Sequence, residues 1–285
     1  MKKEKFIKSP MNYTGGKYKL LPQILPLFPK SINTFVDLFT GGANVAVNVE
    51  ANKIIANDFD KHVVSIYKFF QSYDDGSELV SDIEELVNQY GLSKTNEKGF
   101  YELRDYYNSR KREMPIVLFT LICHSFNHQF RFNSKDEFNM PFGKNRSQWN
   151  KSIEKNLADF YKVIKGKNII FTNNDFRELK VDKLKPNDFV YCDPPYLITC
   201  ATYNEKDGWN EQCERDLLEL LDKLNTQSVK FALSNVLSNK GKINEILSEW
   251  SKKYNVHHLD YTYQNCNYHT KDKENKADEV LITNY

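Results

Sequence analysis

The stretch Asp-Phe-Val-Tyr-Cys-Asp-Pro-Pro-Tyr, residues 188–196, places an acid, two prolines and an aromatic ring directly after an apolar run. A run that is apolar throughout is typical of a strand buried on both faces of an α/β sheet. Each proline fixes its own φ and lacks an N–H, and Pro195 keeps Pro194 extended, so nearby carbonyls stay outside helix and sheet ladders. A carboxylate beside such a carbonyl can hold a planar amino group, and a tyrosine face can stack on a flat ring. The pattern fits an adenine base; the alternative is a strand end closed by a Pro-Pro turn.

Four further runs share this apolar character, at residues 34–39, 53–57, 168–172 and 229–233. Segments with an apolar stripe of helical spacing, at 211–224 and 242–253, accompany them. The last two predicted strands, 256–263 and 279–285, are separated by a polar segment without a helical pattern, which favours an antiparallel finish to the sheet. The predicted fold class is therefore α/β.

Composition narrows the class of protein. The chain has 285 residues, of which 40% are hydrophobic and 27% are charged, as expected for a globular protein. Its apolar runs are too short for a membrane span and its start lacks the pattern of a signal peptide, so we expect a cytoplasmic location. The five cysteines contain no Cys-x-x-Cys pair, which argues against a metal cluster or a disulfide framework. The net charge of +2 does not by itself indicate DNA, but residues 101–155 carry ten Lys/Arg against six Asp/Glu.

The alternation of strands and helices stops between residues 62 and 160. A single loop of that length is implausible, so we predict an inserted domain there and a second domain made of 1–61 and 161–285. The first part of the insertion favours helices at 62–73, 78–90, 98–112 and 114–125. Residues 126–143 carry phenylalanines around Asn-Ser-Lys-Asp and predict a β-hairpin. Such a hairpin could read base edges in a DNA groove or could be purely structural.

A glycine turn follows the first predicted strand. Asp-Leu-Phe-Thr-Gly-Gly-Ala, residues 37–43, would open a helix over 44–50, and its glycines would let a ligand approach the backbone. This indicates a nucleoside cofactor, although Gly-x-Gly-x-x-Gly is incomplete. Asp58, at the end of the next strand, is the predicted ribose ligand; the alternative is that Asp58 or Asp60 caps the following helix. Tyr-Thr-Gly-Gly-Lys at 13–17 lacks the spacing of a P-loop, so Lys17 would contact DNA, close over the cofactor with Tyr13, or face solvent.

Taken together in chain order, four motifs resemble those of the Dam-type DNA adenine methyltransferases, in particular the enzymes of T-even bacteriophages. They are Tyr-Thr-Gly-Gly-Lys at 13–17, Asp-Leu-Phe-Thr-Gly-Gly-Ala at 37–43, Asn-Asp at 57–58 and Asp-Pro-Pro-Tyr at 193–196. The likeness runs almost end to end and includes residues 92–95, 188–199, 233–237 and 249–256. It implies a Rossmann-like, S-adenosylmethionine-dependent methyltransferase domain and an inserted, mainly helical target-recognition domain that bears the β-hairpin. The implied reaction transfers the methyl group to the exocyclic N6 of a flipped-out adenine in double-stranded DNA, with S-adenosylhomocysteine as product.

The resemblance also implies roles for individual residues. Asp193 and the Pro194 carbonyl would accept the adenine N–H bonds, within a loop that Pro195 completes, and Tyr196 would stack on the base. The implied cofactor-binding residues are Tyr13, Lys17, Asp37, Phe39, Gly41, Asp58, Asp175, Phe176 and Asp193. The implied DNA-binding residues are Lys17, Asn127, Gln129, Arg131, Asn133, Pro141, Asn145 and Arg146. No metal ion is implied.

The recognition segment departs from the family pattern. Asn145 stands where phage relatives have an arginine after Phe-Gly-Lys, and residues 128–130 also differ. Recognition of GATC is therefore a hypothesis, and Arg146 could reach the acceptors of guanine instead. Double-stranded DNA is the expected partner in a bacterial or phage-infected cell, with no obligatory protein partner beyond a separately acting cognate restriction endonuclease.

Three other functions fit parts of the sequence. A DNA-binding protein could retain an inactive methyltransferase fold, although every implied catalytic residue is present. The acceptor could be the amino group of cytosine, but relatives with that acceptor usually have Ser in place of Asp193. A nicotinamide dehydrogenase is disfavoured because the glycine turn is incomplete and no acid or base for hydride transfer stands out.

Overall fold

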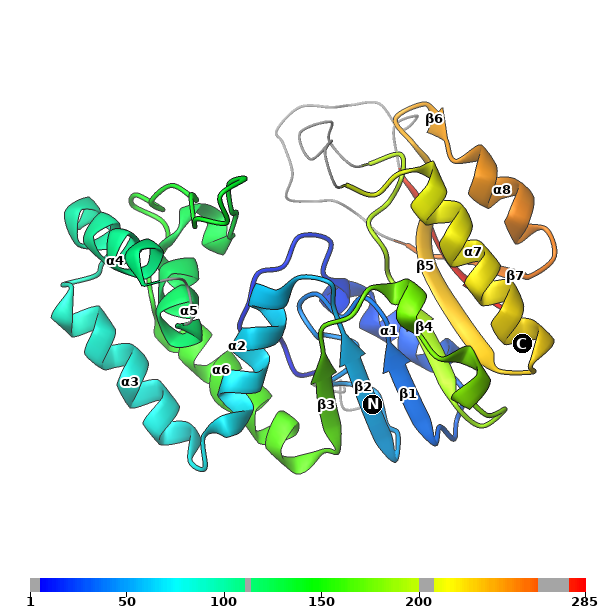
Figure 1. Ribbon diagram of the computed structural model, residues 1–285, viewed down its shortest axis with the longest axis horizontal. Coiled ribbons are helices and arrows are strands. Elements are labelled where there is room, and N and C mark those ends of the chain that lie inside the picture. The colour runs from blue at the N-terminus through cyan, green and yellow to red at the C-terminus, as the bar shows by residue number, and fades with distance from the viewer. Residues whose placement is uncertain (1–5, 111–113, 200–207, 261–276) are drawn as a thin grey trace. The chain divides into compact units, whose positions relative to one another are not determined.

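The computed structural model describes residues 6–110, 114–199, 208–260 and 277–285 (Figure 1). The chain divides into two compact units, described separately below. The first unit comprises Met1–Tyr18, Gly41–Asn48 and Asp60–Asn173, and the second comprises Lys19–Thr40, Val49–Phe59 and Asn174–Tyr285. The predicted strand 256–263, the polar segment after it, Cys200 and Cys266 lie partly or wholly outside the described residues.

The second unit contains a mixed sheet with strands in the order β2, β1, β4, β5, β8, β7. Their bounds are Lys53–Asn57, Thr34–Asp37, Phe189–Cys192, Lys230–Asn239, Asp278–Thr283 and Asn255–His258. The first four are parallel to one another, and β8 runs antiparallel between β5 and β7. The α/β class and the antiparallel finish are thereby confirmed.

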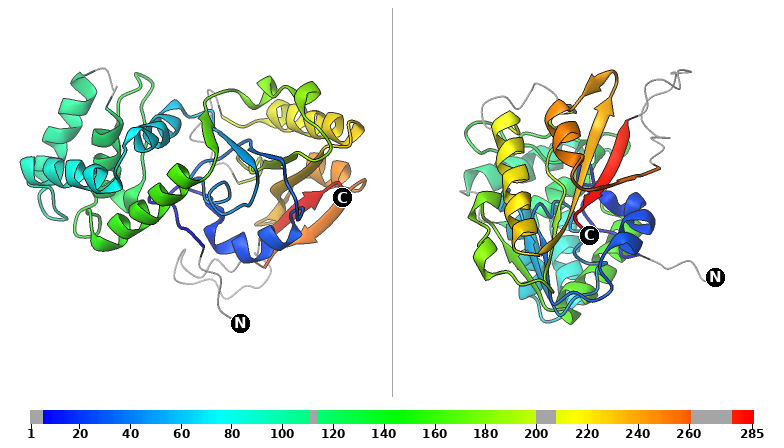
Figure 2. Two further views of the ribbon diagram at one scale, coloured as in Figure 1. Left: turned by 90° about the horizontal axis from the view of Figure 1, so that it is seen from below. Right: turned by 90° about the vertical axis from the view of Figure 1, so that its right-hand side faces the viewer.

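Helices cover the sheet of the second unit on both faces, which explains why the centres of β1, β2 and β4 are apolar. On one face the leucine stripe of α7 (Glu211–Thr226) packs on Val36, Val190 and Phe231. On the other face Phe28, which follows α1 (Leu21–Ile24) and the 3-10 turn Leu25–Leu27, contacts Phe35 and Phe189. Figure 2 shows α7 and α1 on these opposite sides. Alternate residues of β1 and β4 therefore enter two separate cores.

The first unit is mainly helical. It contains α2 (Lys61–Ser72), α3 (Gly76–Gln89), α4 (Glu97–Ser109), α5 (Pro115–His124), α6 (Lys151–Gly166) and the strand β3 (Ile169–Thr172). The apolar helix α5 is almost entirely buried because α2, α3 and α4 pack around it. The four helices predicted between 62 and 125 are confirmed to within a few residues. Helix α6 was not predicted, although an Asn cap at 150 and a buried apolar stripe mark it.

The predicted hairpin is present without regular strands. Single antiparallel bridges join Phe132 to Phe138 and Ser125 to Phe142. Asn133 closes the turn: its backbone N–H donates to the Glu137 carbonyl at 3.0 Å, and its side-chain oxygen accepts from the Glu137 N–H at 3.0 Å. A short polar side chain that bonds its own turn is typical of such loops.

The helix predicted over 44–50 is wrong, because these residues form successive turns. The Nδ2 of Asn48 donates to the Asn44 carbonyl at 2.7 Å, while the Asn48 backbone N–H donates to Val45 at 3.0 Å. The side-chain amide thus takes the carbonyl that an α-helix would pair with the backbone four residues on. Ala43, at φ +55, also leaves the helical region.

The helix predicted over 242–253 is shorter than expected. Residues Lys242–Ile243 form β6, which pairs with the end of β5, and α8 runs only over Glu245–Ser251. The strand predicted at 229–233 correspondingly extends to Asn239. Pairing with β8 and β6 lengthens this strand beyond its apolar stretch, so tertiary contacts override the local pattern.

Cys123, Cys192 and Cys213 are free thiols. Within the described residues, no cluster of three or more His, Cys, Asp or Glu could hold a metal ion. None of the helices in this part of the chain is both long and apolar enough to cross a membrane.

Candidate active site

In the second unit, three neighbouring parallel strands end at one edge of the sheet. β1 pairs with β2 and with β4 in parallel register, so their carboxyl ends point the same way. Ligands of open α/β sheets bind at this edge. The sequence motifs that begin at Asp37, Asn57 and Asp193 therefore follow strand ends at one edge of this sheet.

The side chain of Asn57 fastens the loops at this edge. Its Nδ2 donates to the carbonyls of Leu38 at 3.1 Å and Asn174 at 3.0 Å, and its Oδ1 accepts from the Asn174 N–H at 3.1 Å. Its backbone carbonyl accepts from the Thr40 N–H at 2.7 Å. Asn57 is buried, so these bonds replace solvation and hold the loop after β1 and the segment at Asn174 against the end of β2.

The Asp-Pro-Pro-Tyr loop is ordered by its own side chains. The Tyr196 hydroxyl has one proton and two acceptors within reach, Oδ1 of Asp193 at 3.1 Å and Oε1 of Glu279 at 3.3 Å. Part of the Tyr196 residue stays accessible, whereas its hydroxyl is desolvated. Burial, together with the negative charges of Asp193 and Glu279, raises the pKa of Tyr196 well above its usual value, so the hydroxyl keeps its proton and remains a donor. Sequence analysis missed Glu279.

Three aromatic rings gather beside the end of β1. Phe39 lies 5.5 Å from Phe176 and 5.6 Å from Trp209, and Phe176 lies 5.5 Å from Trp209, measured between ring centroids. Phe39 and Phe176 are among the implied cofactor-binding residues, whereas Trp209 is not. Phe39 and Trp209 stay partly accessible. Such rings offer flat apolar faces for a heteroaromatic ligand.

A buried carboxylate positions Trp209. The Nε1 of Trp209 donates to Oε2 of Glu214 at 2.6 Å, and the other oxygen of Glu214 accepts from Asn235 at 3.1 Å and Asn244 at 3.0 Å. Glu214 is completely buried. Three donors offset the cost of burying its carboxylate and fix the start of α7. A tryptophan just before an Asn-capped helix carries no motif that would have revealed this role.

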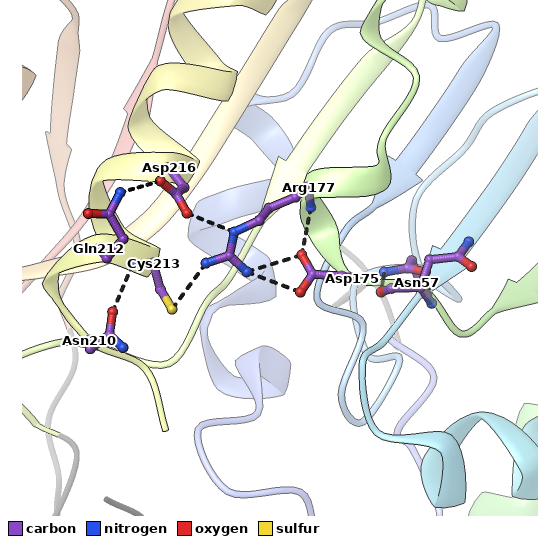
Figure 3. Close-up of polar contacts among 8 residues, drawn as sticks. Asn57, Asp175, Arg177, Asn210, Gln212, Cys213 and Asp216 are labelled. Atoms are coloured by element: carbon purple, nitrogen blue, oxygen red, sulfur yellow. Dashed lines mark hydrogen bonds and ion pairs between the residues drawn. The ribbon is translucent and has the colours of Figure 1, made fainter. Parts of the chain in front are cut away.

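Asp175 supports the loop that carries Phe176 (Figure 3). Both carboxylate oxygens of Asp175 contact Arg177, the nearest pair at 3.0 Å, and Asp175 also accepts from the Arg177 backbone N–H at 2.9 Å. The guanidinium of Arg177 donates to Asp216 of α7 at 2.7 Å. The hydrogen bond with Arg177 lowers the pKa of Asp216. This network ties the segment after β3 to α7.

Asp58 and Asp37 are buried carboxylates at the ends of β2 and β1. The cap of α2 is Asp60, whose side chain accepts from the His62 N–H at 2.8 Å, so capping does not explain Asp58. Oδ2 of Asp37 accepts from the Thr40 hydroxyl at 3.2 Å. An acid at the end of the second strand is placed as in sheets that bind a ribose.

In the first unit, the Gly-Gly turn packs against Tyr13. Gly41 has φ +45, and a Cβ added there would lie 2.9 Å from the Tyr13 ring. The Tyr67 hydroxyl donates to the Gly41 carbonyl at 2.8 Å. Gly41 is therefore required both for its left-handed backbone and for the close approach of the ring.

Lys17 is buried, with 5% of the residue exposed, and its Nζ donates to the Gly15 carbonyl at 2.9 Å. The interpretation as a solvated lysine is therefore wrong. A buried ammonium is costly unless it is hydrogen-bonded, and the bond to the Gly15 carbonyl meets part of this cost.

The predicted DNA-binding residues divide into exposed and structural groups. The exposed ones are Asn127, Arg131, Pro141, Asn145 and Arg146. The side chain of Asn133 is occupied by the hairpin turn, including a bond to the Glu137 carboxylate at 2.8 Å. The Gln129 amide makes a long contact of 3.5 Å with the Thr14 hydroxyl.

Two arginines are held by neighbours on this surface. Arg131 donates from Nε to Oδ1 of Asn139 at 2.9 Å. Arg146 lies over the Phe126 ring at 4.8 Å and donates to Oδ1 of Asn127 at 3.4 Å. Phe126 is 37% exposed, and sequence analysis did not single it out. An exposed ring beside an ordered guanidinium can enter a stack of bases.

The parallel strands β2, β1, β4 and β5 form a Rossmann-like α/β sheet. Residues 13–265 match the model of the D12 class N6 adenine-specific DNA methyltransferases, and the chain belongs to that family. The Dam-type resemblance is thereby confirmed, whereas the particular likeness to T-even bacteriophage enzymes stays a prediction.

Curated relatives agree with the family. The chain is 51% identical to Type II methyltransferase M.FokI of Planomicrobium okeanokoites over 100% of its own length and 44% of that protein. It is 48% identical to Modification methylase StsI of Streptococcus sanguinis, over 99% of the chain and 43% of the relative. It is 26% identical to DNA adenine methylase of Salmonella typhi, over 79% of each. The chain thus spans less than half the length of the first two relatives.

Proposed function

We propose that the protein transfers the methyl group of S-adenosylmethionine to the exocyclic N6 amino group of adenine in double-stranded DNA. The observation that carries this proposal is the Asp193–Tyr196 pair, held by a hydrogen bond at the carboxyl end of β4 in a chain of this family. The new N–C bond replaces the S–C bond of the cofactor, so the products would be methylated DNA, S-adenosylhomocysteine and the proton that the amino group releases.

The residues at the sheet edge fit a nucleoside cofactor. Phe39, Phe176 and Trp209 offer aromatic faces to an adenine ring, and the buried carboxylate of Asp58 suits ribose hydroxyls. When bound, the cofactor would supply a methyl group activated by the positive sulfonium. Asp37, Asp175, Tyr13, Lys17 and Gly41 are the other proposed contributors, with Asp175 acting through the Phe176 loop.

Asp193 and Pro194 would activate the acceptor. The amino nitrogen of adenine is a poor nucleophile because its lone pair is delocalised into the ring. Acceptance of its N–H bonds by the Asp193 carboxylate and the Pro194 carbonyl would favour a tetrahedral nitrogen and stabilise the developing positive charge. The ring of Tyr196, a half-buried residue, would stack on the base, which must leave the duplex to reach it. Alignment of the nitrogen with the methyl carbon would supply much of the rate.

Target recognition is proposed for residues 62–160, with the DNA surface at 126–146. Arg131 and Arg146 are exposed yet ordered, and arginine is the side chain that most often reads guanine in the major groove. Phe126 and Pro141 are the apolar candidates for insertion between bases. GATC remains the hypothesis for the recognised sequence. Contacts from Arg146 to guanine would be the reason for a different recognised sequence.

Relatives named as modification methylases favour a role in a restriction–modification system, in the cytoplasm where the DNA lies. A cognate restriction endonuclease would then act on the same site. The proposal requires no physical contact between the two activities.

Transfer of a labelled methyl group to DNA, followed by mapping of the methylated bases, tests the reaction. Asp193→Ala should abolish transfer while calorimetry still detects S-adenosylmethionine binding. Asp182→Ala, an exposed acid of the same unit, serves as the control and should leave transfer unchanged. If the unaltered protein binds DNA but transfers no methyl group, a DNA-binding protein with an inactive methyltransferase fold would be favoured. If the label is found on cytosine, the acceptor is the amino group of cytosine. Binding of a nicotinamide dinucleotide in place of S-adenosylmethionine would favour a dehydrogenase.

Site choice is tested in the same assay. Arg131→Ala and Arg146→Ala should relax or weaken the choice of methylated sites, because each removes an ordered guanidinium from the proposed DNA surface. Lys135→Ala removes an exposed charge from the hairpin turn and controls for non-specific attraction to phosphates. Unchanged methylation profiles from both arginine variants would move recognition to another surface.

A further inference from the structure

Glu279 is a buried carboxylate that the mechanism above does not use. It belongs to β8, where 4% of the residue is exposed, and it precedes the completely buried residues Val280, Leu281 and Ile282. A carboxylate is costly to bury unless it is hydrogen-bonded. An acid in so apolar a strand therefore calls for a specific partner.

Strand geometry turns Glu279 away from the α7 core. Successive side chains of a strand point to opposite faces, and Val280 and Ile282 enter the core beneath α7. Glu279 shares the other face with Leu281 and lies opposite Val236 of β5 in the antiparallel register. Figure 2 shows β8, in red, beside β5. From this face, Oε1 of Glu279 lies 3.3 Å from the Tyr196 hydroxyl.

We propose that Glu279 is a positioning residue for methyl transfer, which holds the Tyr196 ring in place through its hydroxyl. The inference rests on the proposed function, because it assigns the stacking role to that ring. The hydroxyl lies between two acceptors, Oδ1 of Asp193 at 3.1 Å and Oε1 of Glu279 at 3.3 Å.

The two carboxylates act on the ring from different elements. Asp193 belongs to the same loop as Tyr196 and would move with it, whereas Glu279 belongs to a paired strand of the sheet. The contact with Glu279 therefore fixes the position of the Tyr196 ring relative to the sheet. Because the same hydroxyl also bonds Asp193, displacement of the ring would reorient the carboxylate that accepts the adenine amino group. Small misplacements of reacting groups cost rate rather than binding.

A double-mutant cycle tests this role. The single-turnover rate of methyl transfer is measured for the unaltered protein, Glu279→Ala, Tyr196→Phe and the double variant. Glu279→Ala should slow transfer by about tenfold to a hundredfold, as expected for loss of a hydrogen bond to a charged group. In the Tyr196→Phe background the same substitution should change the rate by less than about twofold, because its partner hydroxyl is already absent. Fully additive effects would overturn the proposal.

Two further variants separate positioning from folding. Glu279→Gln retains an acceptor oxygen of the same reach and should keep the rate within about threefold of the unaltered protein. A loss as large as that of Glu279→Ala would refute the hydrogen-bond role. Leu281→Ala, two residues on and on the same face, weakens the strand without touching Tyr196, so its effect should add to that of Tyr196→Phe. S-adenosylmethionine affinity, measured by calorimetry, should stay unchanged in Glu279→Ala.

The same measurements distinguish an error in the role of Glu279 from an error in the proposed function. If the unaltered protein transfers no methyl group to DNA, the proposed function fails. If it transfers methyl groups and the cycle is additive, only the role of Glu279 fails.

Discussion

The first prediction concerns His124, the last residue of α5, which is 1% exposed. Its Nδ1 lies 2.9 Å from the Thr120 carbonyl, and its Nε2 lies 3.3 Å from the backbone N–H of Trp149. The carbonyl requires a proton on Nδ1, and the N–H requires a lone pair on Nε2, so the network assigns one neutral tautomer. A second proton on Nε2 would oppose the Trp149 N–H and break the contact between α5 and the segment before α6.

The size of the stability loss on acidification follows from the pKa of His124. Burial lowers this pKa from 6.5 to about 4, against the opposite effect of the bond to the Thr120 carbonyl. Between these values the unfolded chain binds a proton that the folded chain does not, so stability falls as the pH falls. At about 1.4 kcal/mol for each unit of pKa difference, His124 alone should remove about 2 kcal/mol of unfolding free energy between about pH 7.5 and about pH 5.

Urea unfolding followed by far-ultraviolet circular dichroism measures this loss, since the long helices α2 to α6 belong to the same unit as His124. The variant His124→Gln is the control: its amide can still accept from the Trp149 N–H, and it does not titrate in this range. It should be less stable than the unaltered protein at neutral pH but should lose about 2 kcal/mol less on acidification. An equal loss in both proteins would refute the assignment of His124 as a neutral, hydrogen-bonded imidazole.

Two other predictions follow from the glycine turn and from Asp188. Gly41→Ala should weaken S-adenosylmethionine binding, measured by calorimetry, more than Gly15→Ala. Both positions have positive φ, but only at Gly41 would the new methyl meet the Tyr13 ring, at 2.9 Å; equal effects would mean that the ring's position is unimportant. Burial raises the pKa of Asp188, but bonds from the Asn33 amide and nearby backbone N–H groups outweigh it and lower the pKa below 3.8. Asp188 should therefore stabilise the fold above about pH 4 and lose that contribution in stronger acid. Unfolding of Asp188→Asn, followed against pH, should lack this loss; the same acid dependence in both proteins would contradict it.

Most of the sheet could be predicted because its strands are buried on both faces. Burial on two sides demands apolar residues at every position, and that demand leaves a local signature in β1, β2 and β4. The turn at 44–50 could not be predicted in the same way. There the side-chain amide of Asn48 takes the backbone carbonyl of Asn44 that an α-helix would pair with a backbone N–H, and this competition depends on three-dimensional geometry.

Only those residues of the candidate site that belong to sequence motifs could be predicted. Asp193 and Phe39 follow strands directly, so their places at the sheet edge follow from strand direction. Glu279 and Trp209 belong to no motif and come from distant parts of the chain. Glu279 acquires its role only because β8 enters the sheet antiparallel beside β5. Asp60 likewise settled a question that the sequence left open, since its cap on α2 removes the alternative explanation for Asp58.

The sequence by itself determined the α/β class of the sheet, the order of the motifs along the chain and the family to which the chain belongs. Those features are local: an apolar run, a glycine turn and a Pro-Pro loop each restrict the backbone near themselves. Only the tertiary structure decided what surrounds the Asp193–Tyr196 pair. A hydroxyl proton finds its acceptors within about 3 Å, whatever their separation along the chain, so the partnership of Tyr196 with Glu279 exists only once the strands have paired.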